Sequence, residues 1–324
     1  MGGVDSQGGP FTGINDATRL SGGSTAIADG AEGAIKVIDA GGTLIRTIGR
    51  RGEGPGEFGS LEWIEQCLPD TLFVWDRVLH RVTVFDSSGR TIRQFTPPGS
   101  PIRMACNSVG QVVVMMRPVM EPNQSVDAQL FASTVVINAF GDSIGSIGMI
   151  QAGQNRPLGT MSGFGVLPGV AIVGTAASSI LSFHSFIGDT IRVLSLPTQR
   201  RVATLRHYRA AIERLMSAVG PSPADDQIRR TLLAVPMPDS LPMFRGLFVT
   251  STGFAWVVTS SYGDGYTDIV GVRLDGPETY AIRLPIEIEV FEIGADFILG
   301  RTADEGGGSK LAGYHFSLVG LSKP

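Results

Sequence analysis

The 324-residue chain is poor in cysteine, histidine and aromatic residues, and it carries little net charge. Its two cysteines form no Cys-x-x-Cys pair, which excludes a zinc site built on cysteine. Because 26 Lys and Arg stand against 30 Asp and Glu, the chain lacks the basic character of a nucleic-acid-binding protein. No uninterrupted apolar run reaches the ~18–20 residues of a membrane helix. We therefore expect neither a nucleic-acid partner nor a membrane span.

The N-terminal residues, "MGGVDSQGGP", have neither the basic segment nor the apolar segment of a signal peptide. We interpret this stretch as the start of a mature chain whose leader has been removed. The same composition predicts a disordered tail over residues 1–11.

The two cysteines, Cys67 and Cys106, lie in apolar, strand-like runs. Free cysteine packs as a small hydrophobic side chain, so we expect two buried thiols. A disulfide between them is the alternative.

An internal repeat dominates the first third of the chain. Residues 26–48 align without a gap on residues 73–95, so that Asp29 falls on Asp76 and Gly42 on Gly89. The second half of the unit recurs once more, with Asn138 and Gly141 at the turn positions. Asp and Asn both initiate turns by bonding their own backbone, and the glycine position predicts a positive φ. Each copy predicts short strands joined by tight turns.

Segments that alternate apolar and polar residues continue to the C-terminus, and 43 glycines and 19 prolines separate them. A four-strand unit every ~40–50 residues is typical of a β-propeller blade. Six units begin near residues 12, 58, 101, 160, 243 and 286. The chain therefore predicts an all-β fold, a six-bladed β-propeller that forms one domain over residues 1–324.

The stretch 49–58, "GRRGEGPGEF", places glycines at alternate positions like a phosphate-binding loop. A phosphate cradle needs a helix after it, and here an alternating strand follows. Glu53 and Glu57 would also repel phosphate. We interpret the stretch as the connection from the outer edge of one blade to the inner strand of the next.

This stretch, together with "IKVIDAGGTLIRTI" and "TLFVWDRVLHRVTVFDSSGRTIRQF", resembles the bacterial six-bladed propellers related to NHL repeats, including TolB-like proteins. The resemblance is most specific over residues 25–96. It implies the propeller fold and an extracytoplasmic location, periplasmic or secreted, and it transfers no catalytic residue. The four histidines do not match the metal-binding histidines of NHL-type enzymes; they are His80, His184, His207 and His315.

Residues 200–234 depart from the strand pattern. Apolar residues from Leu205 to Met216 recur at steps of three and four, which predicts an amphipathic helix, and a second helix follows. We expect a two-helix insertion in or after the fourth blade that covers one end or flank of the ring. Its role is that of a packing lid; a partner-docking or ligand-gating surface is the alternative.

The loops of a propeller converge on the mouth of its central channel, which is therefore the expected binding site. Arg77, Arg117 and Arg301 end comparable strands and would suit a carboxylate or phosphate group. The loop "YGDGYTD" adds three further candidate binding residues, Tyr262, Asp264 and Tyr266, although a solvated hairpin loop is its simpler interpretation.

No catalytic motif stands out, and the matched positions of Asp29 and Asp76 favour a structural turn over a catalytic carboxylate pair. We expect a monomeric, non-enzymatic binding protein that recognises a small ligand, a glycan or a protein at the channel mouth, with no cofactor. The alternative is a calcium-assisted hydrolase, lactonase or lyase, for which Glu62, Asp76 and Asn107 would be the metal ligands.

Overall fold

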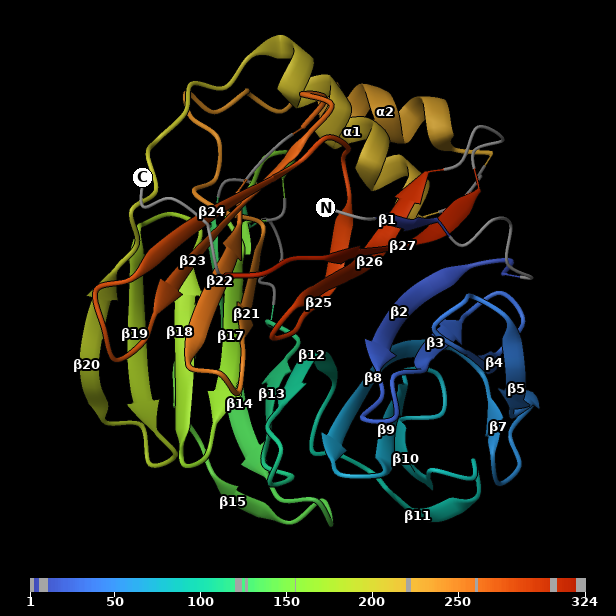
Figure 1. Cartoon of the computed structure of the whole chain (residues 1–324). Coiled ribbons are helices and arrows are strands. Elements are labelled where there is room, and N and C mark those ends of the chain that lie inside the picture. The colour runs from blue at the N-terminus through green and yellow to red at the C-terminus, as the bar shows by residue number, and fades with distance from the viewer. Residues whose placement is uncertain are drawn as a thin grey trace.

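The computed structural model describes residues 3–5, 11–119, 124–125, 128–154, 156–219, 223–259, 262–303 and 308–318. Its strands form six antiparallel sheets arranged around a central axis (Figure 1). The first strand of each sheet contacts the first strands of the two neighbouring sheets, and β25 contacts β2, which closes the ring. The predicted six-bladed propeller is confirmed.

The first three blades run from the inner strand outward as β2 (Ile14–Arg19), β3 (Thr25–Asp29), β4 (Ala34–Ile38) and β5 (Leu44–Ile48); β8 (Leu61–Leu68), β9 (Thr71–Asp76), β10 (Arg81–Asp86) and β11 (Thr91–Phe95); and β12 (Pro101–Cys106), β13 (Val112–Met116), β14 (Gln129–Ile137) and β15 (Ser143–Gly145). The long strand β14 also pairs with β16 (Met149–Gln154).

The last three blades run as β17 (Ser162–Leu167), β18 (Val170–Thr175), β19 (Ile180–Ser185) and β20 (Thr190–Ser195); β21 (Gly246–Val249), β22 (Phe254–Val258), β23 (Thr267–Arg273) and β24 (Thr279–Leu284); and β25 (Glu289–Ile293), β26 (Phe297–Ala303), β27 (Ser309–His315) and β1 (Gly3–Asp5).

The sixth blade takes its outermost strand from the other end of the chain. Strand β1 pairs antiparallel with β27, with Val4 opposite Gly313. This pairing corrects the expectation of a disordered tail for Gly3–Asp5, because the backbone of these residues completes a sheet. The prediction failed because the short stretch has no hydrophobic pattern of its own, and its partner strand lies at the opposite end of the chain.

The core of the ring lies between blades rather than within one. Six clusters of buried apolar side chains each join two neighbouring blades, and the last of them joins Leu299 and Leu311 of the sixth blade to Ile14 of the first. The second strands are mostly buried, and β13 and β22 are buried along their whole length, because a neighbouring blade covers each of their faces.

The turns follow the repeat. Gly42, Gly89 and Gly141 have φ values of 85°, 84° and 91°, which confirms the predicted positive φ at the repeated position. The glycine-rich stretch after β5 forms two short parallel strands, β6 (Arg50–Arg51) and β7 (Glu57–Phe58), and then leads into β8. It is a connection between blades, as predicted.

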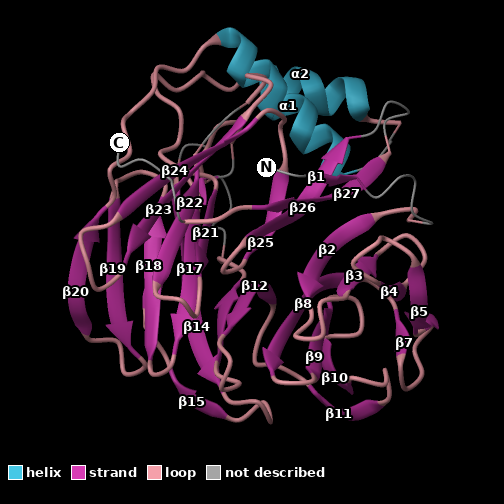
Figure 2. Ribbon diagram, in the orientation of Figure 1, coloured by secondary structure: helices cyan, strands magenta, loops and turns pink. Residues whose placement is uncertain are grey.

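Two helices, α1 (Leu205–Val219) and α2 (Asp225–Ala234), follow the last strand of the fourth blade and precede β21. They lie together outside the ring of strands, at the top of the view in Figure 2. Tyr208, Ile212 and Met216 of α1 are buried in a cluster of their own with Leu158 and Leu241. The predicted insertion is confirmed. Neither helix has the length and apolar character needed to cross a membrane, and the described residues contain no other α-helix.

Candidate functional site

The central channel contains a cavity of about 530 Å³, and residues from all six inner strands line it. Successive side chains of a strand point to opposite faces, so alternate residues of each inner strand face the axis or the flanking blades. The charged side chains that line the cavity include Asp16 on β2, Glu65 on β8, Arg103 on β12 and Glu292 on β25.

Three of the carboxylates that line the channel, Asp16, Glu65 and Glu292, join neighbouring blades. Asp16 accepts the backbone N–H of Ile64 at 3.0 Å, and Glu65 accepts that of Cys106 at 3.2 Å. Glu292 accepts the N–H of Arg19 at 2.7 Å. Each hydrogen bond joins one inner strand to the next. Glu292 links the sixth blade to the first, Asp16 links the first to the second, and Glu65 links the second to the third.

Burial sets the protonation of these groups. It raises the pKa of Asp16 to about 8 and that of Glu65 to about 8, because a charge surrounded by protein is poorly solvated. Burial also raises the pKa of Glu292, whose charge in turn raises the pKa of the other two. Burial lowers the pKa of the nearby Arg103, and the charge of Asp16 opposes that shift. Burial therefore favours the protonated, neutral form of Asp16, Glu65 and Glu292.

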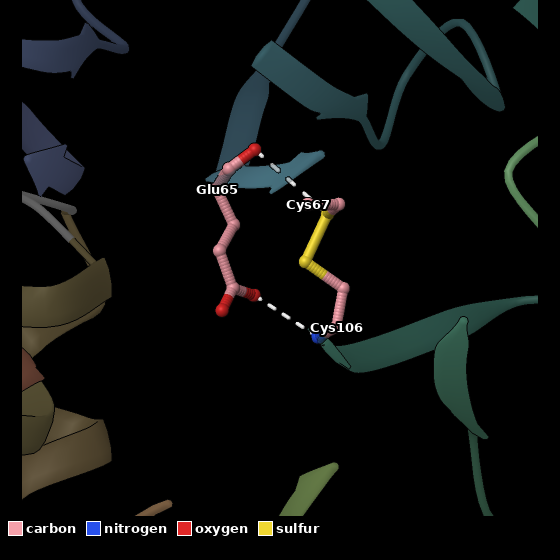
Figure 3. Close-up of side chains that lie close together, drawn as sticks. All are labelled: Glu65, Cys67 and Cys106. Atoms are coloured by element: carbon pink, nitrogen blue, oxygen red, sulfur yellow. Dashed lines mark hydrogen bonds between the residues drawn. A yellow bond between two sulfur atoms is a disulfide. The ribbon is translucent and has the colours of Figure 1, made fainter. Parts of the chain in front are cut away.

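The cysteines lie at the same boundary between the second and third blades (Figure 3). Cys67 of β8 and Cys106 of β12 form a disulfide with their Cα atoms 5.4 Å apart. This finding corrects the expectation of two free thiols. The two residues are 39 positions apart in the chain, so only the arrangement of neighbouring inner strands shows that they meet. Figure 3 shows the Glu65 side chain beside the disulfide, with its carboxylate directed at the backbone nitrogen of Cys106.

A second cavity, of about 970 Å³, opens at the end of the channel where the inner strands begin; we call it the mouth cavity. Helix α1 contributes Ala211, Arg214 and Leu215 to its wall, and α2 contributes Leu232. Five residues line both cavities, so the mouth cavity continues into the channel; they are Ile102, Arg103, Arg117, Phe248 and Val290. The helical insertion therefore covers one end of the ring.

Cations outnumber anions among the described residues that line the mouth cavity. Glu289 is the one carboxylate, and the arginines are Arg103, Arg117, Arg156, Arg214 and Arg245. Burial disfavours the charge of Glu289, but Arg301 and Arg214 outweigh burial and lower its pKa. Burial, together with the nearby charge of Arg214, lowers the pKa of Arg245 to about 10.

An ion-pair cluster holds the start of α1 against the loop before β23. Asp264 accepts hydrogen bonds from Arg201 and Arg206, both at 2.6 Å, and lies 3.2 Å from the ring nitrogen Nε2 of His207. Its side chain is only 5% exposed. Burial raises the pKa of Asp264, but the bonds from Arg201 and His207 outweigh burial, so the net shift is downward.

The structure separates the predicted arginines. Arg117 lines both cavities, and Arg77 lines the channel while it pairs with Glu62 at 2.7 Å. Arg301 does not line either cavity; it donates to Glu289 at 2.9 Å and to the carbonyl oxygen of Ile14. The three do not converge on one point.

The predicted loop residues have three different roles. Tyr262 lines the mouth cavity, and Asp264 anchors α1. The guanidinium of Arg283 covers the ring of Tyr266, 4.2 Å from its centroid. The loop is therefore tied to the helices rather than simply solvated.

The candidate calcium ligands are occupied by other bonds. Asp76 accepts four backbone N–H groups, from Gly59, Ser60, Val78 and Leu79. Asn107 bonds to Gln111 and to the N–H of Val109, within a turn. These contacts do not fit a shared metal site. Among the described residues, one cluster brings metal-ligating atom types together, Glu65 with the two cysteines, and its sulfur atoms are bonded to each other.

Several site residues escaped the sequence analysis: Asp16, Glu65, Arg103, Arg214, Arg245, Glu289 and Glu292. Five of them lie on inner strands, where the signal was a charged residue within an apolar strand: Asp16, Glu65, Arg103, Glu289 and Glu292. Arg214 lies on α1 and Arg245 directly before β21, where the sequence carried no such signal. Alternation alone did not show which face of the strand meets the axis, so a charge there could not be told from a solvated one.

Comparison with known proteins bears on the fold. No family model matches the chain, and no curated protein does. A putative exported protein from Bacteroides fragilis superposes with a TM-score of 0.58 at 12% identity, over 98% of this chain and 95% of that one. A luciferin-regenerating enzyme superposes with a TM-score of 0.50 at 8% identity, over 98% of this chain and 95% of that one. A member of the DUF4221 family from Bacteroides vulgatus superposes with a TM-score of 0.49 at 7% identity, over 94% of this chain and 93% of that one. The chain thus shares the propeller fold with a putative exported protein and with a luciferin-regenerating enzyme.

Proposed function

We propose that this propeller is an extracytoplasmic binding protein that holds a small-molecule ligand in the mouth cavity beneath α1 and α2. One observation carries the proposal: a cavity of about 970 Å³ lies where the inner strands β12, β21 and β25 begin, and it continues into the channel. Ligand sites in proteins are typically clefts of about 300–1,000 Å³ with mostly apolar walls and a few polar groups.

The walls fit this description. Leu215 is 43% exposed although it lies on the apolar side of α1, because it faces the cavity. Leu232, Phe248 and Val258 add apolar surface from α2, β21 and β22, and Tyr262 adds an aromatic ring with a hydroxyl. Such a surface binds the apolar body of a ligand, and the few charged groups orient it.

The disulfide supports the proposed compartment. Disulfides persist in oxidising environments outside the cytoplasm and are rare within it. The bond between Cys67 and Cys106, and the similarity of fold to a putative exported protein, both favour a periplasmic or secreted location. The resemblance of residues 25–96 to the NHL-related and TolB-like propellers also supports this proposal.

A neutral fluorescent probe tests the binding site. N-phenyl-1-naphthylamine brightens in apolar surroundings, and we expect it to bind the purified protein saturably. Leu215→Trp, which fills the cavity from α1, should weaken that binding at least tenfold. Leu205→Trp is the matched control, because Leu205 is 53% exposed on the same helix and does not line the cavity. Absent binding, or equal effects of the two variants, would refute the site.

A further inference from the structure

The charge of the mouth cavity points to the class of ligand. Four of the five arginines that line it come from separate parts of the fold: Arg103 from β12, Arg117 from just after β13, Arg214 from α1 and Arg245 from just before β21. They gather at the mouth only because the blades and the helices meet there. Such a set of guanidinium groups raises the local concentration of anions.

Among the described residues of the cavity wall, the carboxylate of Glu289 does not balance the five arginines. The Oε2 atom of Glu289 already receives Nε and Nη2 of Arg301, both at 2.9 Å, and Arg301 lies outside the cavity. Arg214 is further away, at 3.6 Å from the same oxygen. The arginine lining therefore keeps an excess of positive charge.

Two of the arginines have hydrogen-bonding capacity to spare. Arg245 donates through Nη2 to the carbonyl oxygen of Ile288, but its Nε is buried without a hydrogen-bond partner. That Nε atom is shielded from the cavity, but Nη1 of Arg245 also has no hydrogen bond with any described residue and can donate to a ligand. The guanidinium of Arg117 has no hydrogen bond or ion pair with any described residue, and it lies where the two cavities join.

The apolar part of the wall lies beside these cations. Leu215, Leu232, Phe248 and Val258 line the same cavity. An inorganic anion would pair with the guanidinium groups and leave this apolar surface exposed to water, whereas a neutral apolar molecule would offer no acceptor to Arg117.

We propose that the mouth cavity selects a small organic anion, a carboxylate or a group of similar charge on an apolar body. Arg245 and Arg117 hold its charged end, and the apolar side chains of the helices and of β21 and β22 enclose its body. The inference rests on the proposed function and adds the class of ligand to it. Guanidinium groups suit this task because they present several N–H donors in a planar fork.

Two probes that differ by one charged group test the inference. 8-Anilino-1-naphthalenesulfonate has the ring system of N-phenyl-1-naphthylamine with a sulfonate added. At physiological ionic strength we expect the sulfonate probe to bind at least tenfold more tightly than the neutral one. Arg117→Gln should lower the affinity for the sulfonate probe at least threefold and leave the affinity for the neutral probe unchanged. Arg245→Lys keeps the positive charge but removes the planar guanidinium group. It should also lower the affinity for the sulfonate probe and leave that for the neutral probe unchanged.

The controls separate this inference from the proposed function. Arg50→Gln removes an arginine that lies outside both cavities and should change neither affinity. Equal binding of the two probes would overturn the anion selectivity and leave the binding site in place. Equal losses with Arg117→Gln and Arg50→Gln would also overturn it, because net charge would then be the cause. If neither probe binds, both proposals fail. Competition by inorganic phosphate as strong as that by octanoate would overturn the need for an apolar body.

Discussion

The carboxylate of Asp16 accepts the backbone N–H of Ile64 at 3.0 Å, so a titratable group joins the inner strands of the first two blades. Burial raises the pKa of this carboxyl from 3.8 to about 8. The folded chain therefore binds this proton more tightly than the unfolded chain does. Between these two pKa values, the contribution of Asp16 to stability falls as the pH rises.

Asp16→Asn should remove this dependence, because the amide does not ionise. We expect the free energy of unfolding of the variant, measured relative to the wild type by urea denaturation, to rise from pH 4 to pH 8 by an amount on the order of a few kcal/mol. Asp275→Asn is the control, since that side chain is 81% exposed. Profiles for Asp16→Asn that stay parallel to the wild type would contradict the raised pKa.

Loss of the disulfide should destabilise the ring. The bond joins residues 39 positions apart, and loop-closure entropy for that separation corresponds to about 4 kcal/mol at 25 °C. We expect Cys67→Ser/Cys106→Ser, or the wild type with reductant, to unfold at lower urea concentration. The reductant should not affect the double variant further. Titration of the denatured, unreduced protein with a thiol reagent should find no free thiol, and two free thiols would show that the bond does not form.

Asp76→Ala should be among the most harmful substitutions of a turn residue. Asp76 is 1% exposed and accepts four backbone N–H groups, which alanine would leave without a partner. We expect a loss of at least about 3 kcal/mol by chemical denaturation. Asp39→Ala, at a more exposed turn where two N–H groups are bound, should cost about 1 kcal/mol. Equal costs would show that the N–H groups find water in both places.

Asp264→Ala should release the start of α1. The carboxylate holds Arg201, Arg206 and His207, but the two arginines are partly exposed and can be solvated after its loss. We therefore expect a moderate loss of about 1–3 kcal/mol. Limited proteolysis followed by mass spectrometry should show faster cleavage within residues 200–234 than in the blades. Uniform cleavage over the whole chain would argue against a local role.

The sequence predicted the features that repeat within the chain. Asp29 accepts the N–H groups of Thr12, Gly13 and Glu32, and Asp76 accepts those of Gly59, Ser60 and Leu79, which occupy the matching positions of the next repeat. These bonds are local to a blade, so the spacing of the residues alone indicates them. The structural role predicted for the two aspartates is confirmed.

Contacts between different blades could not be predicted from the sequence. Cys67 and Cys106 meet because β8 and β12 are neighbours around the axis, and no local pattern shows this. The same holds for Arg117 and Arg245, which reach one cavity from different blades. Alternation predicts that a strand has two faces, but only the closed ring decides which face meets the channel.

Strand β1 belongs to the start of the chain, and its partner β27 comes close to the end. During synthesis, the residues of β1 are made long before those of β27, so the sheet that joins them can form only after the intervening blades have been made. The earlier blades can pair their strands as they appear, whereas closure of the ring is a late event that brings distant segments together. A nascent chain stalled before β27 would thus expose an incomplete sixth blade, which makes that blade the natural point of attack for proteases and of capture for chaperones.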